Sequence, residues 1–146
     1  MYRKEWVAPF DREQVEPAYF DRFAAHTRQF PERFSGASVL CIGARLGGEV
    51  RALTRLGALA VGIDLTPGFR NSHVLRGDAS RLLFANSTFD MVYSNVLDHI
   101  PPSVLPTVFL EVRRVLKPGG FFMIDFAQGE YAANTLRTFR VDAPAM

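Results

Sequence analysis

Short apolar runs alternate with helix-length amphipathic segments along the chain from Ser38 onward. Nearly all-apolar runs of this length are typical of strands that are buried on both faces of a parallel sheet. Five strands are predicted, at residues 39–42, 58–63, 73–76, 89–94 and 121–124. The alternation of strands and helices predicts an α/β fold of three layers. In it a parallel sheet carries helices on both faces.

Two helices are predicted between these strands. The first covers Glu49–Leu56 and is closed by Gly57, because glycine favours the left-handed turn that ends a helix. The second begins after Ser103, whose hydroxyl can cap it, and has Pro106 in its first turn, where proline is tolerated. Its apolar side chains recur at helical spacing at Leu105, Val108, Phe109, Val112, Val115 and Leu116. The run 118–120 (Pro-Gly-Gly) is expected to stop it.

The two ends of the chain are interpreted separately. In residues 1–37 the aromatic residues Phe20, Phe23, Phe30 and Phe34 recur at helical spacing, which predicts an N-terminal helical cap segment. It precedes the main domain at 38–146, within a single domain overall. The aromatic face either packs on the main domain or forms a lid or substrate wall. A helix is also predicted over Glu130–Arg140.

Polar and small residues follow the first two predicted strands. Ligands of parallel sheets bind beyond the carboxyl ends of the strands. The turn Gly43–Gly48 follows the first strand, and its glycines let the backbone fold tightly and approach a ligand. Asp64 ends the second strand, 21 residues after Gly43. A carboxylate at this spacing is suited to accept hydrogen bonds from ribose hydroxyls.

The third and fourth predicted strands also end in polar residues. Asp78, beside Ala79, can accept a hydrogen bond from an exocyclic amine. The pair 94–95 (Ser-Asn) ends the fourth strand, and His99 follows within about one helical turn. Because the carboxyl ends of parallel strands meet at one edge of the sheet, these residues are expected to gather around one crevice.

Composition excludes several classes of protein. The chain has 146 residues, of which 48% are hydrophobic and 22% charged, as in an ordinary single globular domain. A net charge of +2 without a clustered basic patch argues against nucleic acid as a partner. No apolar run reaches the roughly 18 residues of a membrane span. The single Cys41 makes neither a disulfide nor a metal site alone, so we expect a cytoplasmic protein without a metal.

The order of these segments resembles the class I S-adenosylmethionine-dependent methyltransferases, especially their small-molecule branch with a type 11-like domain. The resemblance covers roughly residues 38–126 and keeps the family's order throughout. The leucine-lysine-proline-glycine-glycine run at 116–120 is its most diagnostic piece. The matching stretches are 39–47, 61–64, 77–79, 89–95 with Leu97 and His99, and 111–120.

The resemblance implies a Rossmann-like sheet that is shortened at its C-terminal end, in a cofactor-binding domain at 38–146. It also implies S-adenosyl-L-methionine as cofactor and a role for each strand end. The turn 43–47 would hold the methionine portion, Asp64 the ribose hydroxyls, and Asp78 with Ala79 the adenine. The implied cofactor-binding residues are Gly43, Ala44, Arg45, Gly47, Asp64, Leu65, Asp78, Ala79, Ser94 and Asn95. His99 is the candidate general base, or else a helix-start histidine that contacts backbone or cofactor, and Asn95 is the candidate for orienting the acceptor.

Three departures from the family keep other functions open. Cys41 stands where the family commonly has an acidic residue, and Arg45 replaces its middle glycine. The Arg45 guanidinium either crowds the cofactor or pairs with its methionine carboxylate. The short C-terminus leaves the fifth strand as an edge, which invites a homodimer. The alternatives are an inactive S-adenosylmethionine-binding module and, third, a nicotinamide-dependent oxidoreductase, although Arg45 breaks the glycine pattern of a dinucleotide site.

Methyl transfer to an oxygen or carbon of a small-molecule acceptor is the predicted reaction. The sulfonium leaving group is already activated, so the protein contributes mainly by aligning the reactants. Asn95 is not followed by the two prolines and the aromatic residue expected when the family methylates planar amines. Transfer to an exocyclic amine is therefore disfavoured.

Overall fold

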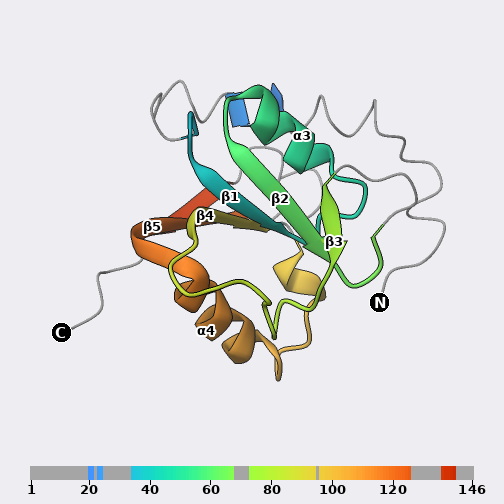
Figure 1. Ribbon diagram of the computed structural model, residues 1–146. Helices are drawn as coiled ribbons and strands as arrows, with labels where there is room; N and C mark the ends of the chain where they lie inside the picture. The colour runs from blue at the N-terminus through green and yellow to red at the C-terminus, as the bar shows by residue number, and fades with distance from the viewer. Residues whose placement is uncertain are drawn as a thin grey trace.

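The computed structural model describes residues 20, 21, 23, 24, 34–67, 73–94, 96–125 and 136–140. Within these ranges the chain forms a six-stranded sheet in the order β3-β2-β1-β4-β5-β6 (Figure 1). The strands are β1 Ser38–Ile42, β2 Leu59–Asp64, β3 Val74–Arg76, β4 Phe89–Ser94, β5 Leu116–Asp125 and β6 Leu136–Arg140. β1 to β5 are parallel and β6 is antiparallel to β5. All five predicted strands are confirmed.

The central strand β1 shows why its sequence is almost entirely apolar. Side chains alternate between the two faces of a strand, and those of Val39 and Cys41 belong to one buried cluster, whereas those of Leu40 and Ile42 belong to another. All four are 2% exposed or less. Both faces of β1 are therefore covered, as the three-layer prediction requires.

Helices lie against both of these faces (Figure 1). α3, Gly48–Arg55, packs Val50 and Leu53 on the Val39 side. α4, Leu105–Val115, packs Val108 and Val112 on the Leu40 side. A short 3-10 helix, η1 at Leu97–His99, lies between β4 and α4 in the chain. Within the described ranges, no helix is both long enough and apolar enough to cross a bilayer.

The two ends of α4 are set by features that the sequence only partly reveals. Pro106 lies in the first turn, as predicted, but Val104 occupies the N-cap position without a side-chain hydrogen bond, so the predicted Ser103 cap is wrong. The helix ends at Val115 and β5 begins directly after it. Leu116 is already extended, with ψ of 139°, and Pro118 also prevents the helix from continuing, because proline disfavours helical backbone in the residue before it, Lys117.

The C-terminal part of the sheet corrects two predictions. Residues 136–140 form β6 and not the end of a helix over Glu130–Arg140; residues 130–135 lie outside the described residues. β6 pairs with β5 from Phe121↔Arg140 to Asp125↔Leu136. The backbone N–H and C=O groups of an open edge strand need partners, and β6 supplies them. β5 is therefore not an edge, and the homodimer predicted through that edge loses its premise.

A charged clamp joins α4 to the loop that leads from β3 to β4. The Arg114 guanidinium donates hydrogen bonds to the carbonyl oxygens of Leu82 and Phe84, each at 2.8 Å, and to Asn86 Oδ1 at 2.9 Å. It also pairs with Glu111, whose Oε1 accepts from the Leu82 N–H at 2.8 Å. The Arg114 hydrogen bond lowers the pKa of Glu111. These contacts hold the 82–86 loop against the helix.

We expect Arg114→Lys to lower the midpoint of thermal unfolding. A lysine ammonium lacks the planar fork that reaches two carbonyls and a carboxylate at once. Arg113→Lys is the matched control, because Arg113 is exposed on the same helix. Equal unfolding midpoints for the two variants would contradict the clamp.

Candidate functional site

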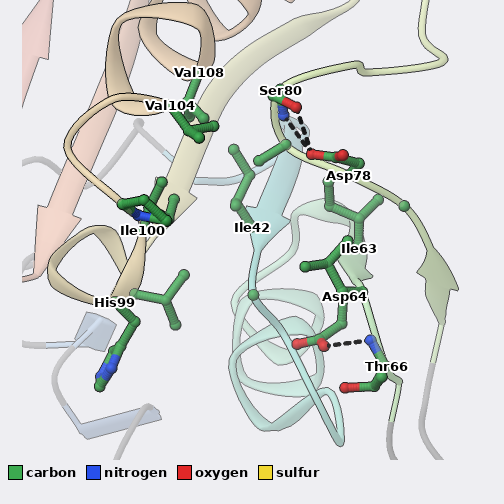
Figure 2. Close-up of a pocket in the computed structure, with 16 residues that line it drawn as sticks. Ile42, Ile63, Asp64, Thr66, Asp78, Ser80, His99, Ile100, Val104 and Val108 are labelled. Atoms are coloured by element: carbon green, nitrogen blue, oxygen red, sulfur yellow. Dashed lines mark hydrogen bonds between the residues drawn. The ribbon is translucent and has the colours of Figure 1, made fainter. Parts of the chain in front are cut away.

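A cavity of about 600 Å³ opens at the carboxyl ends of β1, β2 and β3. This volume lies within the range of small-molecule pockets. Figure 2 shows the ends of β2 and β3 on one side of it, with η1 and the start of α4 on the other. The ends of β1, β2 and β3 therefore meet around one cavity, as predicted from the sequence.

Gly43 lets the turn after β1 approach the opposite wall of this cavity. Its φ is +77°, and a Cβ at this position would lie 2.4 Å from Val96 Cγ2. The N–H groups of Gly43 and Ala44 both donate to the Ile63 carbonyl oxygen, at 2.9 and 3.0 Å. The turn is therefore fastened to the end of β2 through its backbone.

Arg45 adopts the backbone conformation that its glycine counterpart would favour. Its φ is +46°, a left-handed conformation that costs a non-glycine residue about 1–2 kcal/mol. Its backbone N–H donates to Asp64 Oδ2 at 3.0 Å. Arg45 is not among the described residues that line the cavity.

Asp64 is the buried carboxylate of the cavity, with only 5% of its surface exposed. Oδ2 accepts from the Arg45 N–H, and Oδ1 accepts from the Thr66 N–H at 2.9 Å (Figure 2). A carboxylate offers about four lone-pair sites. One on each oxygen is used by the backbone, so each oxygen keeps capacity for a ligand hydroxyl.

Asp78 is a second carboxylate on the same side of the cavity (Figure 2). Its Oδ1 accepts from both the backbone N–H and the hydroxyl of Ser80, at 2.9 and 2.7 Å. The Ser80 hydroxyl, and then the Ser80 N–H, lower the pKa of Asp78. Asp78 is therefore ionised at neutral pH, with Oδ1 held in place by Ser80.

Aliphatic side chains form the facing walls between these polar groups. Ile42 and Ile63 come from the strands, and Ile100, Val104 and Val108 come from the helical side (Figure 2). Burying a flat apolar ring against such walls is favourable in proportion to the area removed from water. The site thus combines an apolar slot with two carboxylates at one side.

The predicted site residues divide into those that line the cavity and those that do not. The lining set includes Gly43, Asp64, Leu65, Asp78, Ala79 and His99. His99 is exposed, on the opposite side from Asp64 and Thr66 (Figure 2). Ala44, Arg45 and Gly47 belong to the adjoining turn and are not among the lining residues, and Asn95 lies outside the described residues.

Ser94 has a different environment from the one expected of a cofactor-binding residue. It is fully buried. Its hydroxyl donates to the Ile42 carbonyl oxygen and accepts from the Val96 N–H, both at 3.3 Å. The hydroxyl therefore joins the ends of β1 and β4 and does not line the cavity.

Sequence reasoning missed several lining residues. Ser80 carried a usable signal, because an aspartate often accepts from the backbone N–H two residues later. Thr66 follows Asp64 at the same spacing. Ile100, Pro101, Val104 and Val108 come from the segment around the start of α4, and only the fold brings them to the strand ends.

Glu49 and Cys41 form a buried titratable pair next to the turn. Glu49 lies in the first turn of α3 and is 2% exposed. Burial raises the pKa of Glu49 to about 8. The Asp64 carboxylate acts in the same direction, whereas the Glu49 backbone N–H and the cations Arg45 and Arg51 oppose it. Burial, with a contribution from Glu49, also raises the pKa of Cys41, which is therefore a neutral thiol.

Comparison with known proteins identifies the family. Residues 40–124 match the methyltransferase domain. The chain belongs to this family. The match supports neither a nicotinamide site nor the reading of the domain as an oxidoreductase.

Curated relatives in this family act on different molecules. The chain is 28% identical over 130 residues to the sterol 4-C-methyltransferase strm-1 of Caenorhabditis elegans, an alignment that covers 79% of this chain and 38% of the relative. It is 34% identical over 122 residues to the fatty-acid O-methyltransferase of Mycolicibacterium smegmatis, covering 75% of this chain and 44% of the relative. The chain therefore spans less than half the length of these two proteins.

Solved structures share the fold. The PH0226 protein of Pyrococcus horikoshii superposes with a TM-score of 0.64 at 28% identity, over 84% of this chain and 62% of that one. Phosphoethanolamine N-methyltransferase 1 of Haemonchus contortus, solved with phosphoethanolamine and S-adenosylhomocysteine, gives a TM-score of 0.64 at 18% identity. This second match covers 81% of this chain and 27% of that one. The Rossmann-like methyltransferase fold is thus confirmed.

We expect Gly43→Ala to destabilise the fold more than Gly36→Ala. Both glycines have positive φ, +77° and +73°, but a Cβ at Gly36 would meet nothing within 4 Å. Both variants therefore lose about 1 kcal/mol to backbone strain. Only Gly43→Ala adds the overlap with Val96, typically about 1–3 kcal/mol for overpacking. Urea unfolding measures both, and equal losses would contradict the close approach.

Proposed function

We propose that this chain binds S-adenosylmethionine in the cavity at the carboxyl ends of β1 to β3 and takes part in methyl transfer to an oxygen or carbon of a small-molecule acceptor. The observation that carries the proposal is the buried Asp64 carboxylate, which is oriented by two backbone N–H groups and retains free lone pairs beside an apolar slot. Membership of the methyltransferase family supports it.

The residues of the cavity fit the adenosyl group. Asp64 has an acceptor site left on each oxygen for the two ribose hydroxyls. Asp78 uses only Oδ1 toward Ser80, so Oδ2 is available to an exocyclic amine of the base. Ile42 and Ile63 face the helical wall across a slot that suits a planar ring. The turn that begins at Gly43 would take the amino-acid portion.

The chain's own contribution to the reaction is mainly positional. Bound S-adenosylmethionine supplies a methyl group on a positively charged sulfur that leaves readily. Holding the reactants in near-attack geometry is worth several kcal/mol or more, about 7–11 kcal/mol for ideal alignment. A general base is needed only where the acceptor must lose a proton. We propose His99 for that role, because its imidazole lines the cavity opposite Asp64.

The acceptor class is proposed from the relatives. One is named a fatty-acid O-methyltransferase and another a sterol 4-C-methyltransferase. Oxygen and carbon acceptors of this apolar kind agree with the absence of the amine-methylation sequence after Asn95. We therefore propose a lipid-like small molecule, with the transfer site at a carboxylate or hydroxyl oxygen or at a carbon.

Methyl transfer to such acceptors is the direct test of the proposed reaction. Protein incubated with S-adenosylmethionine and a set of fatty acids and sterols should form S-adenosylhomocysteine faster than without acceptor. Protein boiled before the incubation is the control. Tight binding of S-adenosylhomocysteine without transfer to any of these acceptors would contradict the acceptor class and favour the inactive binding module.

We expect Asp64→Asn to weaken binding of S-adenosylhomocysteine by about 1–3 kcal/mol, because a hydrogen bond to a charged group is lost. Titration calorimetry measures the change. Asp90→Asn is the control, since Asp90 also accepts a backbone N–H, from Ser38 at 2.8 Å, but lies at the amino end of β4. Unchanged affinity in Asp64→Asn would refute the ribose contact. Failure of the folded, unaltered protein to bind would refute the cofactor.

A further inference from the structure

The carboxyl group of Glu49 stands out among the buried polar groups of the described residues. It is 2% exposed, and no other described residue donates a hydrogen bond to it. The one hydrogen bond that it accepts comes from its own backbone N–H. A buried carboxyl group without outside donors is costly, so its presence needs an explanation.

The position of Glu49 relates it to Cys41. The Cys41 side chain belongs to the buried cluster on the α3 face of the sheet, and Glu49 lies in the first turn of α3. Both groups are therefore buried on the same side of the sheet, and the charge of Glu49 contributes to the raised pKa of Cys41. By the resemblance described above, Cys41 stands where the family commonly has an acidic residue. A carboxyl group is therefore present on the same side of the sheet, although it comes from the helix.

Three charged side chains affect the carboxyl group of Glu49, and only one of them, Asp64, lines the cavity. Among the described residues these are the Asp64 carboxylate at the end of β2, the Arg45 guanidinium in the turn and the Arg51 guanidinium on α3. Asp64 is the proposed ribose acceptor. Glu49 is not among the described residues that line the cavity. It does lie directly after the turn whose Arg45 N–H bonds Asp64 Oδ2, and that turn is the proposed place of the amino-acid portion of the ligand.

We infer that Glu49 is the acceptor for the α-ammonium group of the bound cofactor, and that it replaces the acidic residue missing at position 41. This inference rests on the proposed function. A primary ammonium carries three donors and would supply the partners that the carboxyl group lacks. Cofactor analogues without the amino-acid portion would not use Glu49 at all.

Binding of the ammonium group should change the protonation of Glu49. Because the pKa of Glu49 in the free protein is about 8, the group is protonated at pH 6.5. An ammonium beside it favours the ionised form and lowers the pKa. Binding of a ligand with the ammonium should therefore release up to one proton, and affinity should rise by up to tenfold per pH unit between about pH 6 and 7.5.

Calorimetry with two ligands tests the inference on the unaltered chain. S-adenosylhomocysteine carries the ammonium, whereas 5′-methylthioadenosine has the same adenosine and sulfur without it. Titration at pH 6.5 in two buffers of different ionisation enthalpy counts the released protons. We expect nearly one proton for the first ligand and none for the second. Equal proton counts would overturn the role of Glu49, and failure of both ligands to bind would overturn the proposed function itself.

Glu49→Gln supplies the independent test. The variant has the shape of the protonated glutamate, so it should fold as the unaltered protein does at pH 6.5. We expect its affinity for S-adenosylhomocysteine to fall by about tenfold or more, with the proton release gone and the affinity for 5′-methylthioadenosine unchanged. The double variant Cys41→Asp with Glu49→Gln should regain part of the loss. Equal weakening of both ligands, or of neither, would overturn the inference.

Discussion

The attachment of the turn after β1 to the end of β2 is the constraint on which the site depends. The Ile63 carbonyl oxygen accepts two N–H groups of the turn, and the next residue, Asp64, accepts a third, from Arg45. These bonds hold Arg45 in its left-handed conformation and at the same time orient the Asp64 carboxylate. The floor of the cavity and its buried acid are thus one hydrogen-bonded unit, and neither can move without the other.

The parallel strands could be predicted from the sequence, whereas the ends of the helices could not. Because β1 is buried on both faces, its sequence is an unbroken apolar run at 39–42. The buried side of α4 is likewise visible in the sequence as apolar residues at helical spacing. The N-cap of α4 cannot be recognised in this way: the sequence favours Ser103, a residue type that often caps helices, but the N-cap residue is Val104. Local propensity was correct for the five parallel strands and for the body of α4, and it was incorrect for the α4 cap and for residues 136–140, which form a strand.

Contacts between distant segments account for the remaining differences. β6 forms because β5 offers an unpaired backbone edge, and nothing within Leu136–Arg140 alone shows that partner. Arg114 holds a loop that begins 32 residues earlier, yet in the sequence it is one of several basic residues at a helix end. Ser94 is a polar residue at a strand end, as binding residues often are, but its hydroxyl makes hydrogen bonds to the backbone of Ile42 and Val96. In each case the partner is defined only by the fold.

The departures from the family pattern are better understood together than singly. Cys41 removes a carboxylate from the strand, and Arg45 adds a cation to the turn. Glu49 restores a carboxyl group on the same face of the sheet, and the Arg45 cation partly offsets the burial that keeps it protonated. A neutral acid that ionises only when a cation arrives costs the free protein less than a buried, unpaired charge would. With the proposed role of Glu49, the three departures become one rearrangement, in which the carboxyl group that is missing from the strand is supplied by the helix.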